Sequence, residues 1–216
     1  MHAVIFAGGT LQAGVAVERA LAGADLIVAA DRGAMLALQY GYTPALVVGD
    51  FDSLTFPVQE LEARGCTIIR VATEKDETDT ELAIQASLER GADTITLLGG
   101  LGGARFDHSL ANIFLLTAFK TVPIHIVDGP MVCWLLCGPH EAHIQGRPGD
   151  LLSLFPLSGD AMGISTSNLY YSLHDATLRF GKPRGVSNML IESHAQVKLQ
   201  EGMLLIVHTN IGELQE

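Results

Sequence analysis

Basic residues are scarce in this sequence. It has 13 Lys and Arg against 24 Asp and Glu, which gives a formal net charge of −11. Because nonspecific binding to nucleic acid or to a membrane surface needs clustered Lys and Arg, we expect neither as a partner. An anion such as a nucleotide can still bind to so acidic a protein if a divalent metal ion bridges the like charges.

Cysteine is scarce as well, and long apolar runs are missing. The three cysteines, one at 66 and two at 133 and 137, form neither a CxxC pair nor a zinc cluster with His, so we expect three reduced core cysteines. No segment approaches the roughly 20 apolar residues of a membrane helix, and the apolar stretch near the N-terminus is too short for a secretion signal. We therefore expect a soluble, cytoplasmic protein.

The common nucleotide-binding fingerprints are missing too. The pattern GxxxxGK[ST] does not occur, which excludes a P-loop kinase. The glycine-rich stretch "GGLGGARF" holds no GxGxxG with a suitable strand before it and an acid after it, so a dinucleotide-binding site is disfavoured.

The first part of the chain alternates short β-rich runs with helix-like segments, which predicts βαβ units and a mostly parallel sheet. The predicted strands are 2–6, 25–29, 45–48, 67–71, 94–98 and 124–127, and the predicted helices are 11–22, 34–40, 57–64, 78–90 and 108–119. After residue 129 the pattern changes to short alternating runs separated by Gly and Pro, with no convincing helix. We expect an α/β fold: a Rossmann-like, mostly parallel sheet with flanking helices in 1–129, and an all-β sandwich domain in 130–216.

Glycine or aspartate follows each of the first five predicted strands. In an open α/β sheet, ligands bind beyond the carboxyl ends of the strands, so these segments are expected to share one edge. They are "AGGT" (7–10), "AADRGA" (29–34), "GDFDS" (49–53), "TEKDETD" (73–79) and "GGLGGARFDH" (99–108).

Two of these segments carry paired carboxylates, Asp50 with Asp52 and Asp76 with Asp79. Each acidic motif taken alone could simply cap a helix, and Thr78 with Glu81 matches a capping box. Capping needs only one short polar side chain per helix, however, and converging carboxylates repel each other unless a cation neutralises them. Several hard oxygen ligands suit Mg²⁺, so the sequence predicts a magnesium site.

The same segments suit a phosphate group. Mg²⁺ commonly bridges carboxylates to substrate phosphates, and the glycine-rich turn at Gly8 and Gly9 would let backbone N–H groups approach an anion. Lys75 and Arg105 lie in these segments and would offset phosphate charge.

The sequence resembles the thiamine pyrophosphokinase family over nearly its whole length. The motifs that carry the resemblance occur in the family's order: "DRGA", "PALVVGDFDS", "EKDETDTELA", "GGLGGARFDHSLANIFLL" and "GVSN". Two positions depart from the family pattern. Arg32 stands where the family usually has a second glycine, and "NLYY" (168–171) stands where the family has GLKY or GLKW.

The resemblance implies transfer of the pyrophosphoryl group from ATP to thiamine, giving thiamine diphosphate and AMP. It implies a nucleotide-binding catalytic domain in 1–129, a thiamine-binding domain in 130–216, and a homodimer with active sites at the subunit interface. The residues implied by the resemblance are Asp50, Asp52 and Asp79 for Mg²⁺; Asp76, Arg105 and Asp107 around the transferring group; and Tyr171, Ser187 and Asn188 for thiamine. For the nucleotide we expect Gly8, Gly9, Asp31, Arg32 and Lys75, with Arg32 able to reach a phosphate.

Several alternatives stay open at this stage. Either Asp76 or Asp107 could orient or deprotonate the thiamine hydroxyl. Tyr170 and Tyr171 could be a strand pair with one ring facing in and one out. The chain could be a related diphosphokinase for a pterin-type alcohol, although "GVSN" favours thiamine, or a non-catalytic sensor of nucleotide or thiamine.

Overall fold

The computed structural model describes residues 1–52 and 57–213, and the chain divides into two compact units, Met1–Gly129 and Pro130–Glu216. Ser53, the last residue of the GDFDS motif, lies outside the described residues. Among the residues described, no helix is both long enough and apolar enough to cross a membrane.

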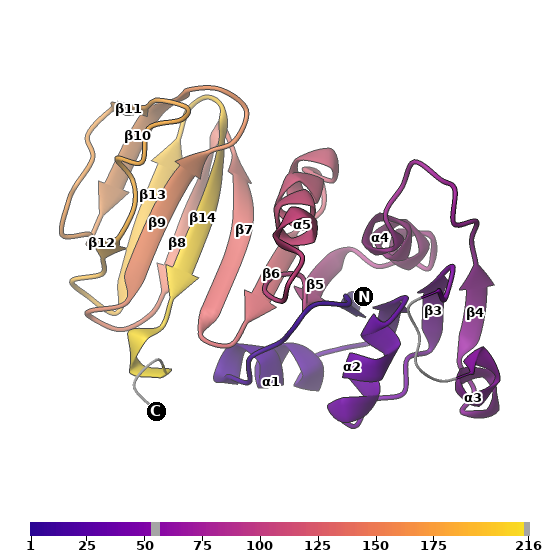
Figure 1. Cartoon of the computed structure of the whole chain (residues 1–216). Helices are drawn as coiled ribbons and strands as arrows, with labels where there is room; N and C mark the ends of the chain where they lie inside the picture. The colour runs from indigo at the N-terminus through magenta and orange to yellow at the C-terminus, as the bar shows by residue number, and fades with distance from the viewer. Residues whose placement is uncertain (53–56, 214–216) are drawn as a thin grey trace. The chain divides into compact units, whose positions relative to one another are not determined.

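The first unit is built on a parallel sheet (Figure 1). Its strands are β1 (His2–Phe6), β2 (Leu26–Ala30), β3 (Leu46–Gly49), β4 (Thr67–Arg70), β5 (Thr94–Leu98) and β6 (Ile124–Asp128). They pair in the order β6-β5-β1-β2-β3-β4, every pair parallel. The chain moves outward from β1 to β4 and then returns to place β5 on the other side of β1, so the direction of winding reverses between β1 and β5.

Helices cover both faces of this sheet, as a parallel sheet requires. Figure 1 shows α1 (Val15–Ala22), α2 (Gly33–Gln39) and α3 (Val58–Ala63) over one face, and α4 (Asp79–Glu89) and α5 (Phe106–Ala118) over the other. This division is what right-handed crossovers produce when the winding direction reverses after β4. The inner strands β1, β3 and β5 are almost fully buried, with Ile5 and Leu97 at or near zero exposure, whereas the edge strand β4 is partly exposed.

The prediction that the first helix begins at residue 11 is wrong, because α1 begins at Val15. The residues before it use their backbone groups in tertiary contacts. The N–H of Gln12 donates to the Asp128 carboxylate at 2.7 Å, and the C=O of Gln12 accepts from the N–H of Gly129 at 3.1 Å. These bonds hold the segment extended across the end of β6, and the helix starts after Gly14.

The second unit contains two antiparallel sheets. One has the order β12-β9-β14-β7 and the other β11-β10-β13-β8. The strands are β7 (Met131–Cys137), β8 (His140–Gln145), β9 (Leu151–Pro156), β10 (Ala161–Ser167), β11 (Ala176–Leu178), β12 (Asn188–Met189), β13 (His194–Leu199) and β14 (Met203–Thr209). Side chains from both sheets share one buried cluster that includes Leu154, Ile164, Val197 and Ile206. A short 3-10 turn, Ile211–Glu213, is the only helical segment that the structure describes in this unit.

Candidate functional site

The glycine-rich segments after β1 and β5 meet where the winding direction of the sheet reverses. The N–H of Gly9 donates to the carbonyl of Gly99 at 3.0 Å. A Cβ atom at residue 9 would lie 2.5 Å from that carbonyl oxygen, so only glycine permits this approach. In open α/β sheets the crevice at such a reversal is the usual ligand site.

Two buried or half-buried side chains that we did not predict as site residues hold these segments in place. The Asn112 amide, on α5, donates to the carbonyl of Gly100 at 2.8 Å and is 6% exposed. Asp128, at the end of β6, accepts from Gln12 as described above, and burial raises the pKa of its carboxyl group although the Gln12 bond opposes this. Asp128 follows the sixth strand, so the strand-end rule applied to the first five strands would have found it.

The segment after β2 packs directly against the segment after β1. A Cβ atom at Gly8 would lie 2.6 Å from Cγ of Arg32, and a Cβ atom at Gly33 would overlap the Phe6 carbonyl. Asp31 is 8% exposed and adopts a left-handed backbone conformation, φ 45°. The predicted nucleotide-binding residues Gly8, Gly9, Asp31 and Arg32 therefore lie in one contiguous region of the first unit.

Asp50 and Asp52 follow β3, beside Asp31. A Cβ atom at Gly49 would lie 3.0 Å from Cα of Asp31, and Oδ1 of Asp50 accepts the Asp52 N–H at 3.2 Å. Neither carboxylate caps α3, whose N-cap is Pro57. Burial would raise the pKa of Asp50, but hydrogen bonds from Asp52 and Thr73 and the charge of Lys75 lower it. The charge of Asp50, followed by burial and the charge of Asp31, raises the pKa of Asp52.

Lys75 and Asp79 bring the segment before α4 into the same group. Nζ of Lys75 lies 3.1 Å from Oδ1 of Asp79 and donates to the Ala72 carbonyl at 3.0 Å. Burial raises the pKa of Asp79, Lys75 opposes this, and the charges of Asp31 and Asp50 raise it further. The capping interpretation also holds here, because the Thr78 hydroxyl accepts the Glu81 N–H at 3.1 Å and α4 begins at Asp79. Asp79 therefore lies in the first turn of a capped helix and also within the acidic group.

Arg105 and Asp107 form a pair at the start of α5. Nε and Nη2 of Arg105 donate to the two carboxylate oxygens of Asp107, with a shortest distance of 2.7 Å. This bond to Arg105 lowers the pKa of Asp107 to about 2. Asp107 does not cap the helix, since α5 begins at Phe106 after Arg105. Asp76 is exposed.

The charges of Asp31 and Asp50 thus raise the pKa values of both Asp52 and Asp79, with Lys75 as the nearby cation. Within residues 1–52 and 57–213, however, no group of three or more His, Cys, Asp or Glu side chains is placed so that it could hold a metal ion.

The three predicted thiamine-binding residues lie close together in the second unit, but Asn188 is buried whereas Ser187 and Tyr171 are exposed. The Asn188 side chain accepts the Tyr171 N–H at 2.9 Å and donates to the Tyr171 carbonyl at 2.8 Å, so it holds the backbone of that residue. Ser187 is exposed and has a left-handed backbone, φ 56°. The strand-pair interpretation of Tyr170 and Tyr171 is wrong: both lie outside the strands, both rings are exposed, and they meet edge to face at 4.9 Å.

These features define a class of α/β protein. It has glycine-rich segments where the winding of a parallel sheet reverses, several aspartate side chains beside them, and an antiparallel β unit that presents aromatic side chains. The family model "Thiamin pyrophosphokinase, catalytic domain" matches residues 17–127, and "Thiamin pyrophosphokinase, vitamin B1 binding domain" matches residues 140–204. The chain belongs to the thiamin pyrophosphokinase family.

Individual relatives agree with this assignment. Thiamine pyrophosphokinase from Bacillus subtilis is 30% identical over 188 residues, which cover 85% of this chain and 87% of that protein. The crystal structure of thiamine pyrophosphokinase from Bacillus subtilis superposes with a TM-score of 0.83 at 27% identity, covering 97% of this chain and 99% of the other. The thiamin pyrophosphokinase structure from Geobacillus thermodenitrificans gives a TM-score of 0.82 at 29% identity, with 97% and 98% covered.

Proposed function

We propose that this protein transfers the pyrophosphoryl group of ATP to the hydroxyl of thiamine, giving thiamine diphosphate and AMP. The observation that carries the proposal is that both parts of the family, catalytic and vitamin B1 binding, match successive parts of this chain. No similarity found supports a pterin-type substrate or a non-catalytic sensor.

In this proposal the first unit is a Rossmann-like nucleotide-binding domain and the second a β-sandwich that seats thiamine. Gly8 would offer its backbone N–H near the reversal of the sheet, where the triphosphate of ATP would bind, while Gly9, whose N–H is bonded to the Gly99 carbonyl, keeps the two glycine-rich segments close together. Asp31 and Arg32 line the neighbouring segment. In the second unit, the exposed ring of Tyr171 can stack on the cationic thiazolium of thiamine, a contact of about 0.5–2 kcal/mol.

The clustered aspartate side chains of the first unit suit a bound Mg²⁺ ion. Burial raises the pKa of Asp79, and repulsion from Asp31 and Asp50 raises the pKa values of both Asp52 and Asp79. A bound divalent cation would offset this repulsion and lower both pKa values. Asp50, Asp52 and Asp79 would hold the ion. Mg²⁺ commonly keeps water and takes phosphate oxygens as ligands, so these carboxylates would supply only part of its coordination shell and the substrate would supply another part. Bound Mg²⁺ would balance negative charge on the transferring group.

Arg105 and Asp107 have separable roles. Asp107 occupies the Nε–Nη2 edge of the guanidinium, which fixes the direction of Arg105 and leaves Nη1 for a phosphate oxygen. A carboxylate with a pKa of about 2 is a poor proton acceptor, so Asp107 is assigned to orienting Arg105. Asp76 is then the remaining candidate to orient or deprotonate the thiamine hydroxyl for in-line attack on the β-phosphorus, a reaction governed mainly by positioning and charge.

The assembly proposed is a homodimer in the cytoplasm. Phe106, Leu110 and Phe114 lie four residues apart on α5 and are 75%, 40% and 50% exposed. Residues at this spacing line one side of a helix. An apolar row of this kind, next to Arg105 and Asp107, suits burial against a second copy of the chain beside the site.

The test of the proposal is an assay of AMP release from ATP with thiamine or with a pterin alcohol, with and without Mg²⁺. We expect AMP only with thiamine and Mg²⁺. Asp52→Asn should lower this rate at least ~100-fold with a melting temperature no lower than that of the wild type, because it removes a proposed Mg²⁺ ligand whose raised pKa makes its ionised form unfavourable to folding. Glu89→Gln, an exposed change at the end of α4 with the same loss of charge, is the control. Near-normal turnover by Asp52→Asn would overturn the metal assignment.

A further inference from the structure

Phe51 separates the two acids of the GDFDS motif and has an unusual backbone. Its φ is 66°, in the left-handed region that a side chain with a Cβ rarely adopts, and its ring is only 9% exposed. Such a conformation persists only where the surroundings hold it in place. Because φ of residue 51 sets the direction of the chain between Asp50 and Asp52, whatever holds Phe51 also sets the relative orientation of the two carboxylates.

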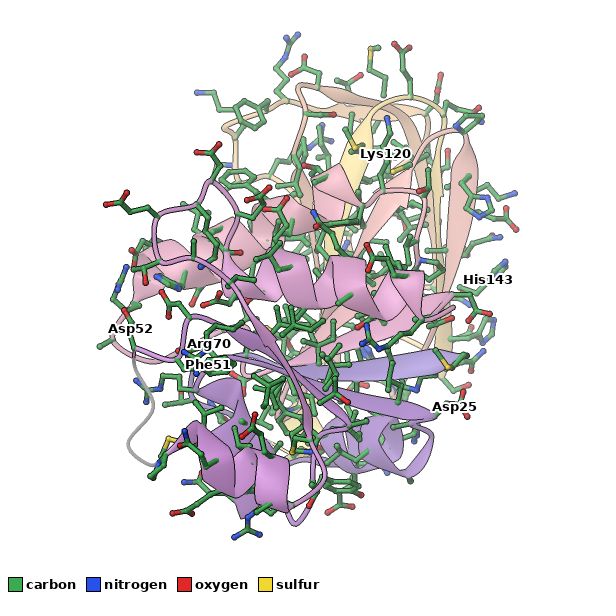
Figure 2. The ribbon with its side chains drawn as sticks, turned by 90° about the vertical axis from the view of Figure 1, so that its right-hand side faces the viewer. Asp25, Phe51, Asp52, Arg70, Lys120 and His143 are labelled. Carbon is green, nitrogen blue, oxygen red and sulfur yellow. The ribbon has the colours of Figure 1, made fainter. Side chains whose placement is uncertain are left out.

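Arg70, the last residue of β4, makes two contacts with this turn. Its guanidinium carbon lies 5.1 Å from the centre of the Phe51 ring, and its Nη1 donates to the Asp50 carbonyl at 3.5 Å. Arg70 pairs in register with Gly49, so the sheet itself delivers the side chain to this position. Figure 2 shows Arg70 beside Phe51, with Asp52 at the same end of the unit.

Other bonds join the same two segments. The N–H of Val71 donates to the Gly49 carbonyl at 3.1 Å, and Thr73 donates to the Asp50 carboxylate. The segment that begins at Arg70 leads directly to Lys75 and Asp79. The ends of β3 and β4 are therefore connected along both the backbone and the side chains, and Arg70 is the residue that contacts the strained turn.

We propose that Arg70 is a positioning residue of the metal site: it holds the Phe51 ring and the Asp50 carbonyl, and thereby fixes the orientation of Asp50 and Asp52 toward a shared cation. This inference rests on the proposed function. Arg70 itself is exposed and contacts neither carboxylate in the structure described, so its action is indirect.

The sign of the effect on metal affinity separates positioning from simple charge. If Arg70 acted only as a positive charge near the acids, its removal would strengthen the binding of a divalent cation, because like charges would no longer repel. If it positions the acids, its removal would weaken binding. If it were merely structural, the melting temperature would fall and the metal affinity of the folded protein would stay the same.

The experiment measures Mn²⁺ binding to the full-length protein by electron paramagnetic resonance without nucleotide, for the wild type, Arg70→Ala, Arg70→Lys and the control Arg64→Ala. Arg64 is an exposed arginine at the end of α3. We expect about tenfold weaker Mn²⁺ binding for Arg70→Ala. Arg70→Lys should bind with intermediate affinity, because an ammonium group retains the charge but lacks the planar face and fork of the guanidinium. Arg64→Ala should match the wild type.

A second measurement follows the turn itself. Amide hydrogen exchange of the peptide that contains Asp52 should be faster in Arg70→Ala, because the Asp52 N–H donates within this turn. Unchanged or stronger Mn²⁺ binding by Arg70→Ala, or unchanged exchange in both variants, would overturn the inference. If Arg70→Ala does not fold, Arg70→Lys decides by the same two readouts. Absence of Mn²⁺ binding and of AMP release in the wild type would instead refute the proposed function.

Discussion

At the scale of single residues, the acidic group is under electrostatic strain that its proposed function explains. Asp79 is half-buried, its pKa is raised by burial, and the charges of Asp31 and Asp50 add to this despite the ion pair with Lys75. A carboxylate in such a place costs stability when it is ionised. This cost is expected of a site for a divalent cation, because the bound cation would neutralise the repulsion between the carboxylates.

This strain predicts the behaviour of Asp79→Asn. A carboxyl group whose pKa is higher in the folded than in the unfolded state binds more protons when folded, so its ionisation lowers stability as the pH rises through the folded pKa. Asp79→Asn should therefore melt higher than the wild type at pH 7, and the difference should vanish below the unfolded pKa of about 3.9. AMP release by this variant should fall at least ~100-fold.

Melting curves of Asp79→Asn and the wild type between pH 3 and pH 8, without metal, check this prediction. Glu89→Gln should show no such pH-dependent difference. A lower melting temperature for Asp79→Asn across the whole range would mean that the ion pair with Lys75 outweighs burial and repulsion.

At the scale of elements, Asn188 and Ser187 show that neighbouring residues of one motif can have different roles. The Asn188 amide is 7% exposed and is used by the backbone of Tyr171 and by the N–H of Met189. It connects β12 to the segment that carries the tyrosines. Ser187 is exposed, and its backbone N–H donates to the Ser153 hydroxyl at 3.0 Å. Its side chain is therefore the better candidate for a direct contact with thiamine.

We expect Asn188→Ala to lower the free energy of unfolding by about 1–3 kcal/mol, because buried backbone groups lose their partners. It should also raise the KM for thiamine while leaving the KM for ATP unchanged. Ser187→Ala should raise the KM for thiamine without a change in stability. Chemical denaturation and steady-state kinetics of both variants check this; a stable Asn188→Ala protein with normal KM values would contradict it.

At the scale of the whole molecule, the catalytic-domain and vitamin B1-binding-domain family models match one unit each. The exposed apolar row on α5 gives a way to test the proposed assembly. We expect the wild type to sediment as a dimer. Phe114→Ser, in the exposed apolar row on α5, should shift the protein toward monomers and lower its activity in proportion, whereas Thr80→Ser on α4 should not. A fully active monomer would remove the shared-interface proposal.

Much of this architecture could be predicted from residue order, but the start of the first helix and the role of Arg70 could not. The alternation of 2–6, 25–29 and 45–48 with helical segments predicted a parallel sheet, and β1, β2 and β3 occupy nearly these residues. The same reasoning placed the first helix four residues too early, because Leu11–Gly14 is compatible with a helix locally and is held extended by Asp128 and Gly129. Arg70 was not predicted at all, since nothing in its sequence neighbours signals a contact with Phe51.

The sequence by itself determined the α/β class of the fold and the family, because periodicity, glycine at strand ends and the order of the motifs are properties of residue order. Only the tertiary structure decided which side chains act on which. Asp107 pairs with Arg105, Asn188 holds Tyr171, and Arg70 reaches Phe51 across the sheet. The Arg70–Phe51 contact depends on the register that pairs Arg70 with Gly49, and the Asn188–Tyr171 contact on the path of the chain around β12, neither of which is apparent from residue order.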